Sequence, residues 1–193
     1  MRHFRRRWAI GGIVLFAVAG AATVALASNF YSTAVGGSPA NNVSLANNSS
    51  HLVRFASVQA AQKASTLDRM SAAYNTPTDI TMTETTSTTA DDVVVFDFTY
   101  GLNGAVAWVV CPDAAFESGS DPNRWCFGQE LRYNLTYADY YDTSGERAWI
   151  ACHELGHTIG LNHVGTTNSC LRLNYNGTTL LSPHDVSHVN SNY

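Results

Sequence analysis

Charged side chains are scarce in this 193-residue chain, at 13% of its residues, and basic ones are the scarcer kind, with 11 Lys and Arg against 15 Asp and Glu. Beyond the first seven residues the sequence has no block of basic residues, which argues against a nucleic-acid-binding protein. No long apolar run is repeated along the chain, so it is not a polytopic membrane protein. A hydrophobic content of 45% is typical of a globular domain and excludes disorder throughout.

The first 27 residues have the pattern of a signal peptide. Four arginines lie in the first seven positions, residues 8–27 carry no charge, and Ala25-Leu26-Ala27 forms a small-x-small cleavage site. We predict cleavage after Ala27, secretion to the extracellular space and no stable membrane association afterwards. An uncleaved signal anchor is the alternative, because an uncharged run of about twenty residues just spans a bilayer.

The rest of the chain is divided into a leader and one domain. Residues 28–50 are rich in Ser, Asn, Ala and Gly and have no periodic apolar pattern. We therefore interpret 28–52 as a flexible leader or short pro-region, and 53–193 as a single catalytic domain, which we expect to be monomeric.

Four cysteines follow the signal segment, and secretion favours disulfides over free thiols. Four cysteines allow three pairings, among which sequence alone does not choose. The local pairs Cys111–Cys126 and Cys152–Cys170 are the ones we favour. A cysteine metal ligand is the less favoured alternative, because no Cys-x-x-Cys pair is present.

Apolar periodicity and turn signals predict an α+β domain. Residues 53–74 are predicted to form an amphipathic helix, and 81–89 either an exposed strand or a loop. Strands are predicted at 93–98, 105–110 and 127–135. The segment 105–108 is either an edge strand that pairs with substrate or a central strand.

Two further helices have recognisable first residues. Thr143 and Glu146 form a capping-box pattern at the start of a helix that runs to about Gly160. Ser182-Pro183 opens the last helix, with a capping residue followed by proline at the first helical position.

The helix that follows Thr143 carries a histidine pattern typical of a zinc site. His153 and His157, four residues apart, lie one turn apart on one helix face and present their imidazoles to one point. His163 joins them only if the chain turns first, and Gly160 can take the left-handed conformation that such a turn needs. Three nitrogen ligands with an open fourth position are the arrangement of a catalytic Zn²⁺.

Glu154 lies beside the first of these histidines but points about 100° around the helix from it. Its carboxylate is therefore placed to act as a general base toward a zinc-activated water rather than to bind the metal. A helix with buried histidines and no metal is the alternative, and it leaves this glutamate and the turn glycine unexplained.

The segment HELGHTIGLNH, residues 153–163, resembles the signature H-E-x-x-H-x-x-G-x-x-H of the metzincin zinc peptidases at every fixed position. The downstream spacing and the C-terminal segment are similar to the matrixin branch. The resemblance implies a metzincin-like fold, with a twisted mixed sheet, an N-terminal helix, an active-site helix and a C-terminal helix. It also implies a substrate cleft and cleavage of protein or peptide substrates by a metalloendopeptidase.

Leu171 departs from the family pattern, because it stands where metzincins have the methionine of the Met-turn. That methionine forms a hydrophobic floor and is not a ligand, so we expect leucine of similar volume to fit. The departure leaves open an alternative function, a catalytically weak or inactive zinc-stabilised secreted binding domain.

Calcium is a second candidate cation. Loop aspartates offer oxygen ligands for it, although a solvated acidic surface explains them as well. These aspartates are Asp91, Asp92, Asp97, Asp113 and Asp121.

Overall fold

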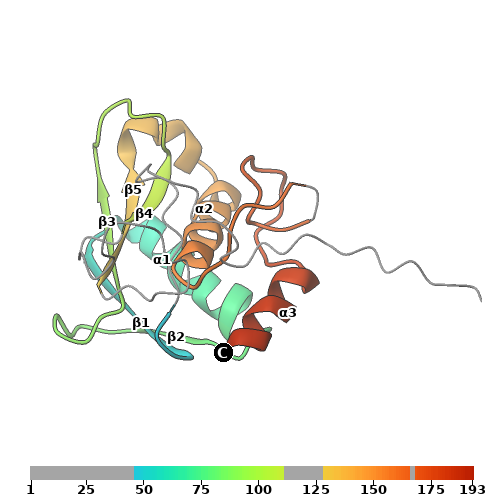
Figure 1. Cartoon of the computed structure of the whole chain (residues 1–193). Helices are drawn as coiled ribbons and strands as arrows, with labels where there is room; N and C mark the ends of the chain where they lie inside the picture. Colours follow the sequence, from blue (N-terminus) through green and yellow to red (C-terminus); the bar gives the residue numbers. More distant parts are fainter. Residues whose placement is uncertain (1–45, 111–127, 166–167) are drawn as a thin grey trace, which may run out of the picture.

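The computed structural model describes residues 46–110, 128–165 and 168–193, which form a mixed five-stranded sheet with helices packed against it (Figure 1). This arrangement confirms the predicted α+β fold class and its mixed sheet. The strands are β1 (Ser50–Ser57), β2 (Thr81–Glu84), β3 (Val93–Phe98), β4 (Ala107–Val110) and β5 (Gln129–Asn134). The α-helices are α1 (Ala60–Arg69), α2 (Ser144–His157) and α3 (Pro183–Asn192), with the π-helix η2 (Met70–Asn75) and the 3₁₀ segment η3 (Leu135–Tyr141).

The strand order in the sheet is β2-β1-β3-β5-β4. β1 pairs in parallel with both β2 and β3, β3 pairs in parallel with β5, and β4 is antiparallel to β5. α1 and η2 connect β1 to its parallel neighbour β2 in a β-α-β unit. β4 lies at one edge of the described sheet, which confirms an edge rather than a central position for this strand, and its pairing with substrate stays a prediction.

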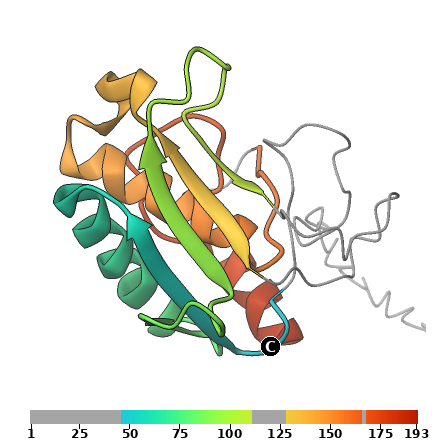
Figure 2. The same cartoon turned by 90° about the vertical axis from the view of Figure 1, so that its left-hand side faces the viewer.

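The helices α1 and α2 lie side by side on one face of the sheet, and the twist of the strands is visible in Figure 2. The buried apolar residues form one cluster that joins the sheet to these helices, with Val53 and Leu131 from strands and Leu155 from α2 all fully buried. Within the described residues, no helix combines the length and apolarity needed to cross a membrane.

The predicted helix over 53–74 is wrong in its first part. Ser50–Ser57 is strand β1, and a helix begins only at Ala60. His51 and Val53 are buried whereas Leu52 and Arg54 are partly exposed, a period of two that matches a strand paired on both sides. Because β1 begins at Ser50, the fold starts before the predicted boundary at residue 53.

Other element predictions agree with the structure. β3 has the predicted bounds, β4 and β5 lie within the predicted strands, and β2 resolves the alternative at 81–89 in favour of a strand over its first four residues. Thr143 and Glu146 form a complete capping box on α2, as predicted. Ser182 caps α3 through a similar reciprocal pair with Asp185, and Pro183 occupies its first turn.

His51 is a fully buried polar residue that connects β1 to the end of α2. Its Nε2 lies 3.0 Å from Oγ1 of Thr158, whose hydroxyl donates to the Leu155 carbonyl at 2.7 Å. The hydroxyl proton is therefore already used, so His51 donates its Nε2–H and is the neutral Nε2–H tautomer. Burial lowers the pKa of His51 to about 4.

We predict that this histidine makes stability depend on pH. Its pKa in the folded chain lies below the ordinary value of 6.5, so the unfolded chain binds the proton first as the pH falls. The free energy of unfolding should decrease between pH 6.5 and about 4, by at most about 3 kcal/mol from His51 alone. The free energy of unfolding, measured with urea at several pH values in this range, should fall less steeply with decreasing pH for His51→Gln than for the native chain. The same pH dependence in both proteins would contradict the assignment.

Candidate metal centre and active-site cleft

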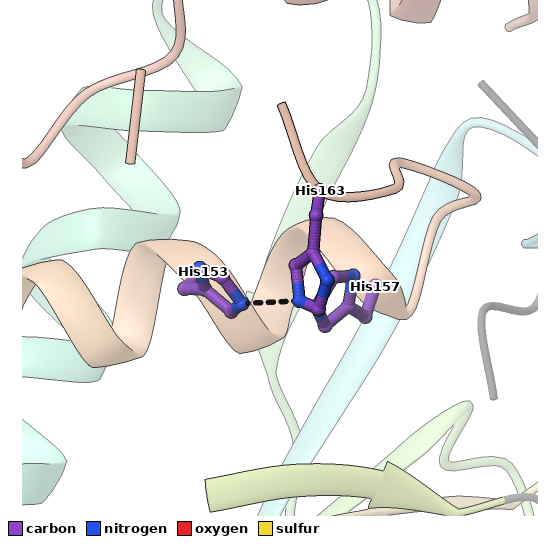
Figure 3. Close-up of side chains that lie close together, drawn as sticks. All are labelled: His153, His157 and His163. Carbon is purple, nitrogen blue, oxygen red and sulfur yellow. Dashed lines mark hydrogen bonds between the residues drawn. The ribbon is translucent and has the colours of Figure 1, made fainter. Parts of the chain in front are cut away.

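The C-terminal half of α2 presents two of the predicted ligands, His153 and His157, one turn apart. The helix ends at His157, and Gly160 has a φ of 100°, the left-handed conformation predicted for it. This turn returns the chain to the helix and places His163 above it (Figure 3). The three histidines that the sequence pattern predicted as ligands are therefore brought together.

The imidazoles converge through their Nε2 atoms. Nε2 of His163 lies 3.0 Å from Nε2 of His153 and 3.2 Å from Nε2 of His157. Within the described residues these histidines form the one group of potential ligands whose donor atoms all lie within 4.8 Å of one another. Nitrogens bound tetrahedrally to zinc at the usual distance lie about 3.3 Å apart, so a single ion fits with small ring movements.

Backbone carbonyls determine which ring nitrogens face inward. Nδ1 of His153 donates to the carbonyl of Cys170 at 2.9 Å, and Nδ1 of His157 donates to the carbonyl of Leu161 at 2.7 Å. A carbonyl oxygen only accepts, so both Nδ1 atoms carry the hydrogen, and a neutral ring then has a lone pair on Nε2. These two lone pairs and the nearby Nε2 of His163 form a donor set that one cation can share.

The environment keeps all three rings neutral. Burial, together with the charge that His163 would carry, lowers the pKa of His153 to about 4. Burial lowers the pKa of His157 well below its ordinary value and also lowers the pKa of His163. Metal-ligating histidine must be deprotonated, so this donor set is ready for a metal at neutral pH.

Glu154 lies next to His153 in α2 and is also buried, with 5% of its surface exposed. Its Oε2 has no hydrogen-bond partner, and burial raises the pKa of its carboxyl to about 8. A cation held by the adjacent imidazoles would lower this pKa, because it stabilises the carboxylate. Glu154 is outside the group of converging nitrogens, as predicted for a base rather than a ligand.

A cleft of about 310 Å³ opens over these residues. The three histidines and Glu154 line it, together with residues 104–107, which lead into the edge strand β4. Trp149 and Tyr175, whose rings lie 5.7 Å apart, also line the cleft. Tyr175 is 40% exposed and therefore belongs to the rim of the cleft.

Leu171 is fully buried beneath α2, where the hydrophobic floor was predicted. A Cβ atom on Gly156 would lie 2.9 Å from Cδ1 of Leu171 and 3.0 Å from the hydroxyl oxygen of Tyr74. The helix therefore approaches this floor as closely as glycine allows. The Leu171 side chain therefore packs directly against α2 at Gly156.

The predicted disulfide Cys152–Cys170 is present, with a Cα–Cα distance of 5.9 Å. The other favoured pair, Cys111–Cys126, lies outside the described residues, as do Asp113 and Asp121.

The described calcium candidates already have protein partners. Asp91 pairs with Arg54, Asp92 accepts from the Leu52 amide, and Asp97 accepts from the Gln59 amide. Calcium binding stays a prediction.

Several contributors to the site were missed in the sequence. The carbonyls of Cys170 and Leu161 orient two histidines, but backbone oxygens leave no side-chain signal in a sequence. Trp149 packs edge-on against His153, with ring centroids 5.6 Å apart. Its position four residues before His153 is the helical spacing that could have revealed this contact.

The matrixin family model matches residues 45–193, which include all five strands, the metal centre and α3. A comparison with curated protein sequences gives no match.

We predict that methionine is tolerated at position 171. Leu171→Met conserves volume and should change the free energy of unfolding by less than about 1.5 kcal/mol. Leu171→Ala, the matched control, leaves a cavity under α2 and should cost about 2–5 kcal/mol. Urea unfolding of the three proteins measures the difference, and a loss from Leu171→Met as large as that from Leu171→Ala would show that the floor does not accept an unbranched chain.

Proposed function

Because the chain belongs to the matrixin family, we propose that it is a secreted, zinc-dependent metalloendopeptidase that hydrolyses peptide bonds in proteins. The observation that carries the proposal is the convergence of three neutral imidazole nitrogens beside a buried carboxyl with a free oxygen. Both features lie at the base of one cleft, so a metal ion, a proton acceptor and an extended substrate could meet there.

His153, His157 and His163 would hold the zinc ion. When bound, zinc supplies a Lewis acid that polarises the scissile carbonyl and lowers the pKa of a water molecule. Glu154 accepts a proton from the attacking water at its free carboxylate oxygen and afterwards donates it to the amine nitrogen of the leaving product. The surrounding burial keeps bulk water from competing for this proton.

The edge strand β4 supports binding of an extended peptide. Its outer side has no neighbouring strand in the described sheet, and residues 104–107 line the cleft beside the histidines. A substrate that adds to this edge as a further strand would place its backbone across the metal centre. Trp149 and Tyr175, which line the same cleft, would then be available to contact its side chains.

The alternative is a secreted binding domain that zinc stabilises but that does not hydrolyse peptides. It would explain Leu171, but it gives no role to a glutamate whose free oxygen is buried beside the ligands. Leu171 also fits its position under α2, which removes the reason to expect lost activity.

We predict that Glu154→Ala retains zinc but loses hydrolysis of casein-like substrates. Removal of a general base typically lowers the rate by about 10²–10⁴-fold, whereas the three imidazoles remain. Zinc content and casein cleavage, measured on one preparation, test both parts. Turnover by the variant at the native rate would refute the role of Glu154, and complete loss of zinc would show that the histidines alone do not hold the metal.

We predict one zinc ion per chain and loss of activity on its removal. A chelator should abolish casein cleavage and added Zn²⁺ should restore it, because the three histidines provide the metal site. His163→Ala should reduce the zinc content. Among the three ligands it gives the clearest test, because His163 lies outside α2 and its replacement leaves the helix intact. Cleavage that persists without metal would refute the proposed mechanism. Zinc binding without cleavage would favour the alternative function, a zinc-stabilised binding domain.

A further inference from the structure

The Cys152–Cys170 disulfide encloses the whole metal centre. Its two cysteines are 18 residues apart, and His153, His157 and His163 all lie between them. Cys152 directly precedes His153 in α2, so the cross-link is attached to the helix at the first ligand.

Cys170 is also the hydrogen-bond partner of that same ligand. Its carbonyl accepts from Nδ1 of His153 at 2.9 Å, the contact that turns Nε2 toward the other two rings. One residue is therefore cross-linked to the helix beside His153 and bonded to the ring of His153. The cross-link limits how far this carbonyl can move from the ring that it orients.

The second oriented ligand needs no such cross-link. The acceptor for His157 is Leu161, only four residues further along the chain. Leu161 is held by the helix end itself, because its amide donates to the Gly156 carbonyl at 2.9 Å. The acceptor for His153 is 17 residues away, so its position depends on tertiary contacts.

The helix end of the cross-link is itself fixed in the core. Both cysteines are fully buried, and the hydroxyl of Tyr74 donates to the Cys152 carbonyl at 2.5 Å. The backbone of Cys170 has one further anchor, because its amide donates to the Leu180 carbonyl at 2.9 Å. Without the disulfide, Cys170 would have no covalent link to α2, and only non-covalent contacts would hold it near His153: its own hydrogen bonds and the packing of the adjacent Leu171 against Gly156.

We propose that this disulfide is a positioning element of the metal centre, which sets zinc affinity by holding the Cys170 carbonyl against Nδ1 of His153. The proposal rests on the proposed zinc site. Loss of a group that orients a metal-binding histidine typically weakens metal affinity by about 10–100-fold. A chain that has not formed this disulfide should therefore bind zinc weakly, so that oxidation of the cysteines precedes stable loading of the metal.

The test compares two variants of the full chain that lose similar stability. Cys152→Ala/Cys170→Ala removes the cross-link and leaves no thiol at these positions to bind zinc. Ile80→Ala removes a fully buried side chain just before β2, at the sheet edge opposite the cleft. Each change should cost about 2–5 kcal/mol of stability.

The main measurement is the zinc dissociation constant, determined by competition with a chromophoric chelator. The double cysteine variant should bind zinc about 10–100-fold more weakly than the native chain, with an altered visible spectrum when loaded with Co²⁺. Ile80→Ala should stay within about twofold of the native value, because it leaves the disulfide and the hydrogen bond from His153 to the Cys170 carbonyl in place. Equal affinities in the double cysteine variant and the native chain, or equal losses in the two variants, would overturn the proposal.

A second measurement applies if the double cysteine variant does not fold. The zinc-loaded chain, with Cys111 and Cys126 replaced by alanine, is treated with a trialkylphosphine and iodoacetamide. The phosphine reduces the disulfide to two thiols and takes the oxygen of water to become its oxide, and alkylation then blocks both thiols. Because both cysteines are buried, the mass of the treated chain must first show that two alkyl groups were added. Zinc should then pass to the chelator faster than from the untreated chain, and an unchanged rate from the doubly alkylated chain would overturn the proposal. A native chain that binds zinc but cleaves no peptide would refute the proposed enzyme without affecting this result.

Discussion

The inward orientation of three imidazole nitrogens is the constraint on which the site depends. The neutral rings of His153 and His157 direct their Nε2 lone pairs to one point and cannot satisfy each other, whereas a cation bound there accepts both lone pairs. Protonation of a ring would give its inward nitrogen a hydrogen to donate, but burial lowers the pKa of each ring and opposes this. The folded chain therefore has to hold these rings by other contacts, and the carbonyls of Cys170 and Leu161 supply them.

Both ends of the helix that carries the ligands are fixed, and the sheet holds the second of them. At its start the Thr143 capping box satisfies amide groups that would otherwise lack partners. At its end His51 from β1 bonds to the Thr158 hydroxyl, and Gln129 from β5 donates to the Thr158 carbonyl at 2.9 Å. Thr158 directly follows His157, so two strands hold the residue from which the chain turns toward His163. Buried polar groups of this kind are costly unless they are bonded, and here they define one position for the helix end.

The site could be predicted from the sequence because its signals are local. The spacing of His153 and His157 corresponds to one helical turn, and Gly160 marks the turn that follows. The Cys152–Cys170 pairing was favoured as a local cross-link, and the structure confirms it. The contacts that orient the rings could not be predicted, because they use backbone oxygens brought near by tertiary folding.

The error at β1 has a different origin. Over 53–58 the spacing of the apolar residues suits a helix as well as a strand, and such short runs do not distinguish the two. Pairing decided the outcome, because β1 has a parallel neighbour on each side. Those neighbours are β2 and β3, which begin about 30–40 residues later in the sequence, beyond the reach of a local pattern.

The environment of Glu154 joins metal binding to proton transfer. Burial raises the pKa of its carboxyl to about 8, so without a cation the group is mostly protonated at neutral pH and cannot act as a base. A cation held by the adjacent imidazoles stabilises the carboxylate and lowers this pKa, and by linkage the ionised carboxylate strengthens binding of the cation. The free Oε2 is then a proton acceptor with no competing hydrogen-bond donor from the described protein. The same burial that makes ionised Glu154 costly in the metal-free chain therefore restricts its basic form to the state in which a metal is present.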